Sequence, residues 1–104
     1  MSHVVTKLPT KEAFSGELDS RFRAQVGEGP EFDLFLVKVV DGISSPMQEA
    51  FSLRFRAPVD APAFQSIYRL SNEALGEMDL FLVPISKDDS GLYYEAVFNH
   101  LVGI

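Results

Sequence analysis

The residues best suited to recognition chemistry in this sequence are its five arginines. All of them fall in segments that we expect to be strands, at positions whose parity places them on the outer face: Arg21, Arg23, Arg54, Arg56 and Arg69. If the strands expected over 50–57 and 66–71 pair as a hairpin, then Arg54, Arg56 and Arg69 form one basic patch. A guanidinium can bind a carboxylate or phosphate through two parallel hydrogen bonds. The sequence therefore predicts a binding surface here, against the simpler alternative that these arginines only solvate the outer face and block edge pairing.

A second candidate site lies on the strand expected near the C-terminus. Tyr94 and His100 share the inward parity of Phe98, so we expect both at a mouth of the domain. A histidine there could act as a general base or bind a ligand. No acid or nucleophile accompanies it, so the alternative is a histidine at the core edge that is hydrogen-bonded to backbone. Without a catalytic constellation, we do not expect an enzyme.

No cofactor or metal site is expected from the remaining motifs. The run Asp88-Asp89-Ser90 offers oxygen ligands, but it lacks the alternating spacing of a calcium loop and is typical of a solvated hairpin tip. Gly27 and Gly29 precede a proline and a strand, so no helix N-terminus assists phosphate binding there. The chain contains no cysteine, which excludes disulfides and thiolate ligands.

Length and charge limit the classes of partner. A chain of 104 residues is expected to form one domain spanning 1–104, with residues 1–9 as a flexible arm. The formal net charge of −6 argues against binding to nucleic acid or to an anionic membrane. No apolar run approaches the roughly 20 residues that cross a bilayer, and the first residues do not resemble a signal peptide. We therefore expect a cytoplasmic protein.

The clearest structural pattern is the strict alternation over residues 50–57. Phe51, Leu53 and Phe55 alternate with polar residues, which is typical of a strand with one buried and one solvated face. Turn signals rich in glycine and proline divide the chain into further segments of this kind. Strands are expected over 21–26, 32–40, 50–57, 66–71, 78–85 and 92–102.

These segments predict a mainly β fold: about six antiparallel strands forming a small barrel or sandwich, with a short N-terminal helix. Thr10 is expected to cap that helix, in which Phe14 and Leu18 would cover one edge of the core together. The nearly continuous apolar runs over 32–40 and 78–85 indicate either central strands or a homodimer contact.

Five segments, taken in order, resemble a family of small bacterial domains of unknown function, over about Phe14 to Asn99. They read Phe51-Ser-Leu-Arg-Phe-Arg-Ala-Pro58, Gln65-Ser-Ile-Tyr68, Leu75-Gly76, Leu80-Phe-Leu-Val-Pro-Ile85 and Tyr94-Glu-Ala-Val-Phe-Asn99. The family's pattern commonly has a glycine before the first proline, where this chain has Ala57. Within the motif, we expect Gly76 to adopt a positive φ and Glu95 to pair with an outward arginine across the sheet.

The resemblance implies an assembly or accessory role, because members of that family are often encoded near tail-collar-like proteins of phage-related systems. It supplies no catalytic residues. The expected function is therefore a non-enzymatic structural or protein-interaction module with a protein partner, accessory to a phage-tail-like collar protein. The alternative is a small-molecule-binding β-barrel with Tyr94 and His100 at its mouth.

Overall fold

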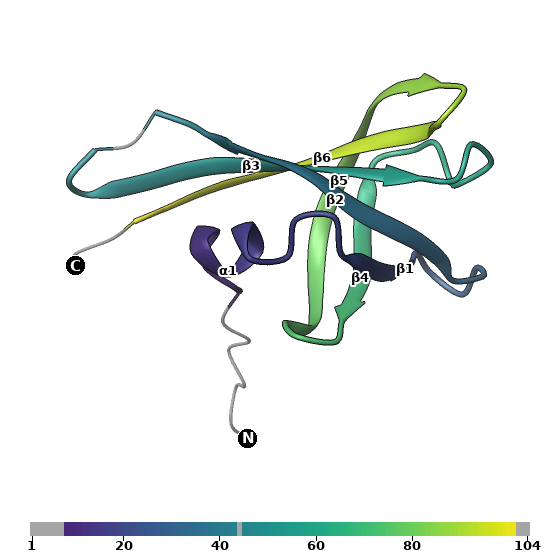
Figure 1. The fold of residues 1–104 in the computed structure, drawn as a ribbon, viewed down its shortest axis with the longest axis horizontal. Coiled ribbons are helices and arrows are strands. Elements are labelled where there is room, and N and C mark those ends of the chain that lie inside the picture. The colour runs from purple at the N-terminus through teal and green to yellow at the C-terminus, as the bar shows by residue number, and fades with distance from the viewer. Residues whose placement is uncertain (1–7, 44, 102–104) are drawn as a thin grey trace.

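The computed structural model describes residues 8–43 and 45–101 of the chain. Figure 1 shows one short helix and a sheet that curls on itself. In the described residues the elements are α1 (Lys11–Ser15), β1 (Arg21–Gln25), β2 (Phe32–Asp41), β3 (Gln48–Ala57), β4 (Ser66–Asn72), β5 (Gly76–Asp88) and β6 (Gly91–Leu101). The predicted mainly β fold with a short N-terminal helix is confirmed.

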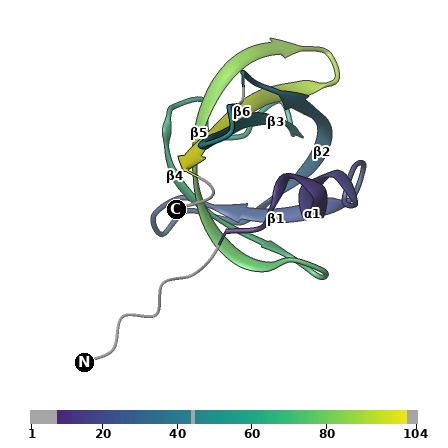
Figure 2. The ribbon, with the colours of Figure 1, turned by 90° about the vertical axis from the view of Figure 1, so that its left-hand side faces the viewer.

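The six strands of this part of the chain form one sheet that closes in the order β1-β2-β3-β6-β5-β4. Every neighbouring pair is antiparallel, and β4 returns to β1 to close the ring. Seen from one end, the strands surround a common centre (Figure 2). Of the two predicted architectures, the molecule therefore adopts the barrel.

The alternation on β3 sorts side chains between the core and the surface. Phe51, Leu53 and Phe55 are buried, whereas Arg54 is exposed. β3 pairs with β6 through ten successive residues, the longest pairing in the described barrel. The buried aromatic and aliphatic side chains of both strands form the centre of the hydrophobic core.

The helix α1 covers one end of the barrel, next to β1 and β2 (Figure 2). As predicted, Thr10 caps it: its hydroxyl oxygen accepts a hydrogen bond from the Ala13 N–H at 3.1 Å. Phe14 is fully buried, with its ring centroid 5.5 Å from that of Phe98. The expected pairing of Phe14 with Leu18 is wrong, because the helix ends at Ser15 and Leu18 is exposed.

The strand β5 is longer than the predicted 78–85 and pairs with two neighbouring strands, one after the other along its length. Its first half, 76–82, pairs with β4, and its second half, from Val83 to Asp88, pairs with β6. A bulge between Pro84 and Ser86 lies in the second half. In Figure 1, β5 descends away from β6, which continues beside β3. Beyond Glu95, the paired residues of β6 in the described chain are therefore those of β3.

Candidate functional site

The ring order separates the arginines that were expected to form one patch. β3 lies between β2 and β6, whereas β4 lies between β1 and β5, so the two strands are three positions apart in either direction. The expectation that Arg54, Arg56 and Arg69 share a surface is therefore wrong. Alternation determines which face a side chain occupies, but it does not determine which strands are neighbours. The segment 58–65 crosses one end of the barrel and does not close a hairpin.

Each of these three arginines is instead engaged locally. The Arg54 Nε lies 3.9 Å from a carboxylate oxygen of Glu95 on β6, which confirms the expected pairing of Glu95 with an outward arginine. The Arg69 Nε lies 3.4 Å from Asp79 on β5. The Arg56 guanidinium lies over the Phe35 ring, 5.5 Å from its centroid. Exposed pairs of this kind contribute about 1 kcal/mol or less to stability.

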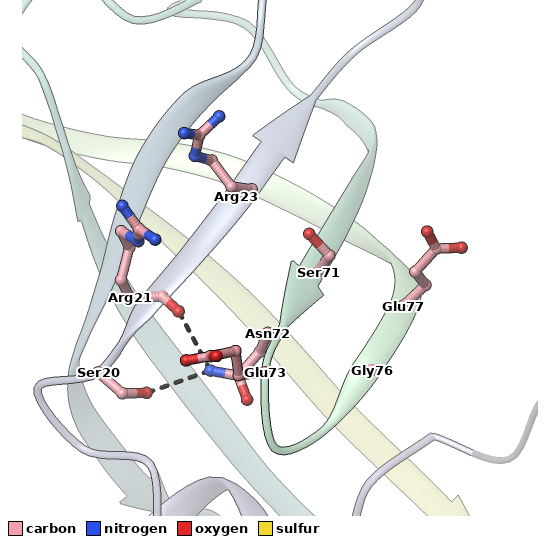
Figure 3. A pocket seen from close by; sticks show the side chains of 8 residues that line it. All are labelled: Ser20, Arg21, Arg23, Ser71, Asn72, Glu73, Gly76 and Glu77. Carbon is pink, nitrogen blue, oxygen red and sulfur yellow. Dashed lines mark hydrogen bonds between the residues drawn. The ribbon is translucent and has the colours of Figure 1, made fainter.

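The structure instead places Arg21 and Arg23 of β1 together at a pocket beside the β1–β4 seam. Arg23 of β1 is the direct cross-strand neighbour of Ser71, and Gln25 is that of Arg69. A pocket of about 380 Å³ opens beside this seam, lined by the eight residues labelled in Figure 3. They come from Ser20 and the start of β1, from the end of β4, and from the β4–β5 turn with the first residues of β5. Arg21 and Arg23 carry the positive charge of this pocket, and Glu73 and Glu77 carry its negative charge.

The floor of this pocket is organised by Asn72, which is only 8% exposed. Its side-chain amide donates hydrogen bonds to the Ser20 hydroxyl at 3.3 Å and to the Arg21 carbonyl at 3.1 Å (Figure 3). Its side-chain oxygen accepts from the N–H groups of Ala74 and Leu75, both at 2.9 Å. The Asn72 side chain therefore ties the β4–β5 turn to the beginning of β1. The sequence predicted a turn here but not this connection.

The turn above Asn72 ends at Gly76, which has a φ of 81°. This is the left-handed conformation predicted for that glycine, and it would strain any other residue. Nothing lies within 4 Å of the position that a Cβ would occupy, so the requirement comes from the backbone and not from crowding. The turn therefore leaves this wall of the pocket open.

The outer face of β4 and β5 carries an unexpected apolar patch. Ile67 and Phe81 are direct cross-strand neighbours and are 63% and 53% exposed. Val97, on β6 beyond the end of its pairing with β5, is 71% exposed. The apolar run of β5 was interpreted as a central strand or a homodimer contact. The strand has one buried face only, so its outward-facing member Phe81 lies on the surface, and the homodimer contact stays a prediction.

The second candidate site, predicted from Tyr94 and His100, does not form at one mouth of the barrel. Tyr94 is fully buried, and its hydroxyl donates a hydrogen bond to the carbonyl oxygen of Pro62 in the segment that covers this end of the barrel. Burial raises the pKa of Tyr94. His100 lies six residues further along β6, about 20 Å away at the rise of an extended strand. Tyr94 therefore lies in the first half of β6 and His100 next to its last residue, and the side chain of His100 lies outside the described part of the structure.

Two further findings concern the described residues as a whole. No cluster of three or more histidine, cysteine, aspartate or glutamate side chains suited to holding a metal ion occurs among residues 8–43 and 45–101. In the same ranges, no helix has the length and apolar character needed to cross a membrane.

One family model matches the chain. It is described as a domain of unknown function (DUF6916), and the match covers residues 9–98. No curated protein and no solved structure matches the chain.

Proposed function

Since the chain belongs to the DUF6916 family of domains of unknown function, we propose that it is a non-enzymatic interaction module that binds another protein. The observation that best supports this proposal is the exposed apolar patch on β4 and β5. Ile67 and Phe81 keep more than half of their surface in contact with solvent although they lie side by side. Burying such a pair against a partner removes apolar area from water and favours association.

Charged pairs border this apolar patch, as is typical of a protein interface. The Arg69–Asp79 pair lies on the same two strands, one outward position further along. On the other side of the patch, Glu95 of β6, which lies 3.9 Å from Arg54, is the cross-strand neighbour of Val83 on β5. An apolar centre with a polar rim gives affinity at the centre and orientation at the rim.

The partner that we propose is a tail-collar-like protein of a phage-related system, in the bacterial cytoplasm. The resemblance described above supports this choice, because members of that family are often encoded near such proteins.

Co-purification tests the proposed function. The tagged chain is expressed in its host together with its genomic neighbours, and the retained proteins are identified by mass spectrometry. We expect the collar-like protein to be retained in a fixed ratio to the chain. A monomer that retains none of its neighbours would contradict the proposal.

The alternative of a small-molecule-binding barrel is not favoured by the geometry. The interior is occupied by the buried side chains of the core, and both ends are covered, by Phe14 at one and by the segment 58–65 at the other. A ligand site in a barrel needs an open and partly empty mouth.

A further inference from the structure

We propose that the pocket between β1 and the β4–β5 turn binds a dipolar segment of a partner protein, with a carboxylate and a cationic side chain next to each other. This inference rests on the proposed function and specifies what the interface recognises. It follows from the charges that line the pocket, from the lack of ion-pair partners for Arg21, Glu73 and Glu77 among the described residues, and from the position of the pocket relative to the apolar patch Ile67–Phe81.

Arg21 supplies the anion-binding side of the pocket. Arg23 is held by Glu31 and Asp33, each at 3.0 Å, and the other arginines are paired or lie over a ring as described above. Among the five arginines, only Arg21 has neither a carboxylate within ion-pair distance nor an aromatic ring under its guanidinium in the described chain, and it is exposed at the pocket wall. A guanidinium without an ion-pair partner can donate hydrogen bonds to a ligand carboxylate without breaking an existing ion pair. The Ser71 hydroxyl, on the adjacent strand, offers a further donor.

Glu73 and Glu77 supply the cation-binding side. Both are exposed, and neither has an ion-pair partner among residues 8–43 and 45–101. Figure 3 shows Arg21 and Arg23 on one side of Ser71 and Glu77 on the other, with Glu73 on the arginine side beside Ser20, so both signs of charge line the pocket. A ligand with one sign of charge would be attracted by one wall and repelled by the other. A ligand with both signs satisfies both walls, and this is the basis of selectivity.

The position of the pocket favours a protein segment as its occupant. The outward residues of the β4–β5 pair follow one another in register: Ser71 beside Glu77, Arg69 beside Asp79, then Ile67 beside Phe81. The pocket and the apolar patch are therefore four residues apart on one face, about 13 Å along the strands. An extended segment about five residues long spans this distance. It would place an apolar side chain on Phe81 and its charged pair in the pocket.

Synthetic peptides test this inference by nuclear magnetic resonance. The probe is a capped peptide in which a leucine precedes an Asp-Lys pair by four residues, titrated into the isotope-labelled full chain. Two control peptides replace the aspartate by asparagine or the lysine by glutamine. We expect the Asp-Lys peptide to bind about tenfold more tightly than either control, as one charge-assisted hydrogen bond predicts. Amide shifts should be centred on Ser71, Asn72 and Gly76.

Variants of the chain test the contributions of Arg21 and of the two glutamates separately. Arg21→Gln should remove the preference for aspartate and leave the preference for lysine, whereas the double variant Glu73→Gln/Glu77→Gln should do the reverse. Arg56→Gln, on the other side of the ring, is the matched control and should change neither. Equal binding of all three peptides, or an unchanged preference in Arg21→Gln, would overturn the inference.

The pocket inference and the proposed function can fail separately. If retention of the collar-like protein depends on Phe81 but not on Arg21, Glu73 or Glu77, the chain is an interaction module whose pocket has no part in recognition. If the peptides bind the pocket but no partner is retained, the site stands and the proposed function fails.

Discussion

The hydroxyl groups of Tyr68 and Tyr94 converge on the carbonyl oxygen of Pro62, with the two rings 5.4 Å apart. Tyr68 lies 3.4 Å from this oxygen and makes a shorter hydrogen bond, 2.7 Å, to the carbonyl of Phe64. Both tyrosines are fully buried. The segment 58–65 contains no helix or strand, and these two side chains hold it over the end of the barrel.

Removal of the Tyr94 hydroxyl should therefore weaken the closure of this end. Tyr94→Phe keeps the ring but removes the hydroxyl that donates a hydrogen bond to the Pro62 carbonyl. We therefore expect the free energy of unfolding to fall by about 1 kcal/mol. Urea denaturation measures this change. Tyr93→Phe is the matched control: its hydroxyl lies on the outer face, without a hydrogen-bond partner in the described chain, and we expect a change within about 0.5 kcal/mol. Equal losses in both variants would contradict the role of Tyr94.

The same burial predicts a loss of stability at alkaline pH. The pKa of Tyr94, and also that of Tyr68, is raised in the folded protein, chiefly because burial disfavours the phenolate. Above the ordinary tyrosine pKa of about 10, the unfolded chain loses these protons while the folded chain keeps them. The contribution of these two groups to the free energy of unfolding should therefore be constant below that pH and fall above it, by up to about 1.4 kcal/mol per pH unit and group.

Denaturation between pH 8 and pH 11.5 checks this dependence. The fall should be shallower in Tyr94→Phe than in the original chain, because one of the two groups is absent. An identical slope in both proteins would show that Tyr94 does not carry the effect.

Phe14 should be required for stability, although it lies on a helix of only five residues. Its ring packs against Phe98 and, at 6.3 Å between centroids, against Phe51. Phe14→Ala should cost about 3–5 kcal/mol, and Leu18→Ala, at an exposed position, less than about 0.5 kcal/mol. If Phe14→Ala leaves no folded protein to measure, Phe14→Leu should show a smaller loss by urea denaturation. A loss at Leu18 as large as at Phe14 would contradict the observed end of the helix.

Asn72 should be the polar residue whose loss costs most at the pocket. Asn72→Ala removes two donated and two accepted hydrogen bonds at a site that is largely shielded from water. We therefore expect the free energy of unfolding, measured by heat or urea, to fall by about 2–3 kcal/mol. Asn99→Ala is the control, because that side chain is exposed and makes one hydrogen bond, with Gln48. A change at Asn72 no larger than at Asn99 would mean that the turn does not depend on this connection.

The strands themselves could be predicted from the sequence because burial follows from alternation. The period of two in Phe51, Leu53 and Phe55 predicts directly which side chains lie in the core. The glycine at position 76 indicates a positive φ, which other residues avoid. Both properties are local. The capping of α1 by Thr10 is local as well, and it was also predicted correctly.

The neighbours of each strand could not be predicted in this way. The parity of Arg54 and Arg69 placed both outside, but their separation around the ring depends on how the segment 58–65 crosses the barrel. The connection of Asn72 to Ser20 and Arg21 joins residues about 50 positions apart, and a single sequence contains no signal for it. The exposure of Phe81 likewise depends on the fact that no further element covers β4 and β5 in the described chain.

The most direct test of the proposed interaction surface is the affinity of the proposed collar-like partner, once purified, for two single variants that each replace an exposed apolar residue by serine. Phe81→Ser alters the exposed patch, and Val59→Ser alters an apolar side chain that is 45% exposed and comes just after the end of β3, the strand three positions from β4 around the ring. Binding measured by calorimetry should weaken at least about tenfold in Phe81→Ser, as expected for an apolar residue at an interface centre, and stay unchanged in Val59→Ser. Equal affinity of Phe81→Ser and the original chain would contradict the proposal that this face binds the partner.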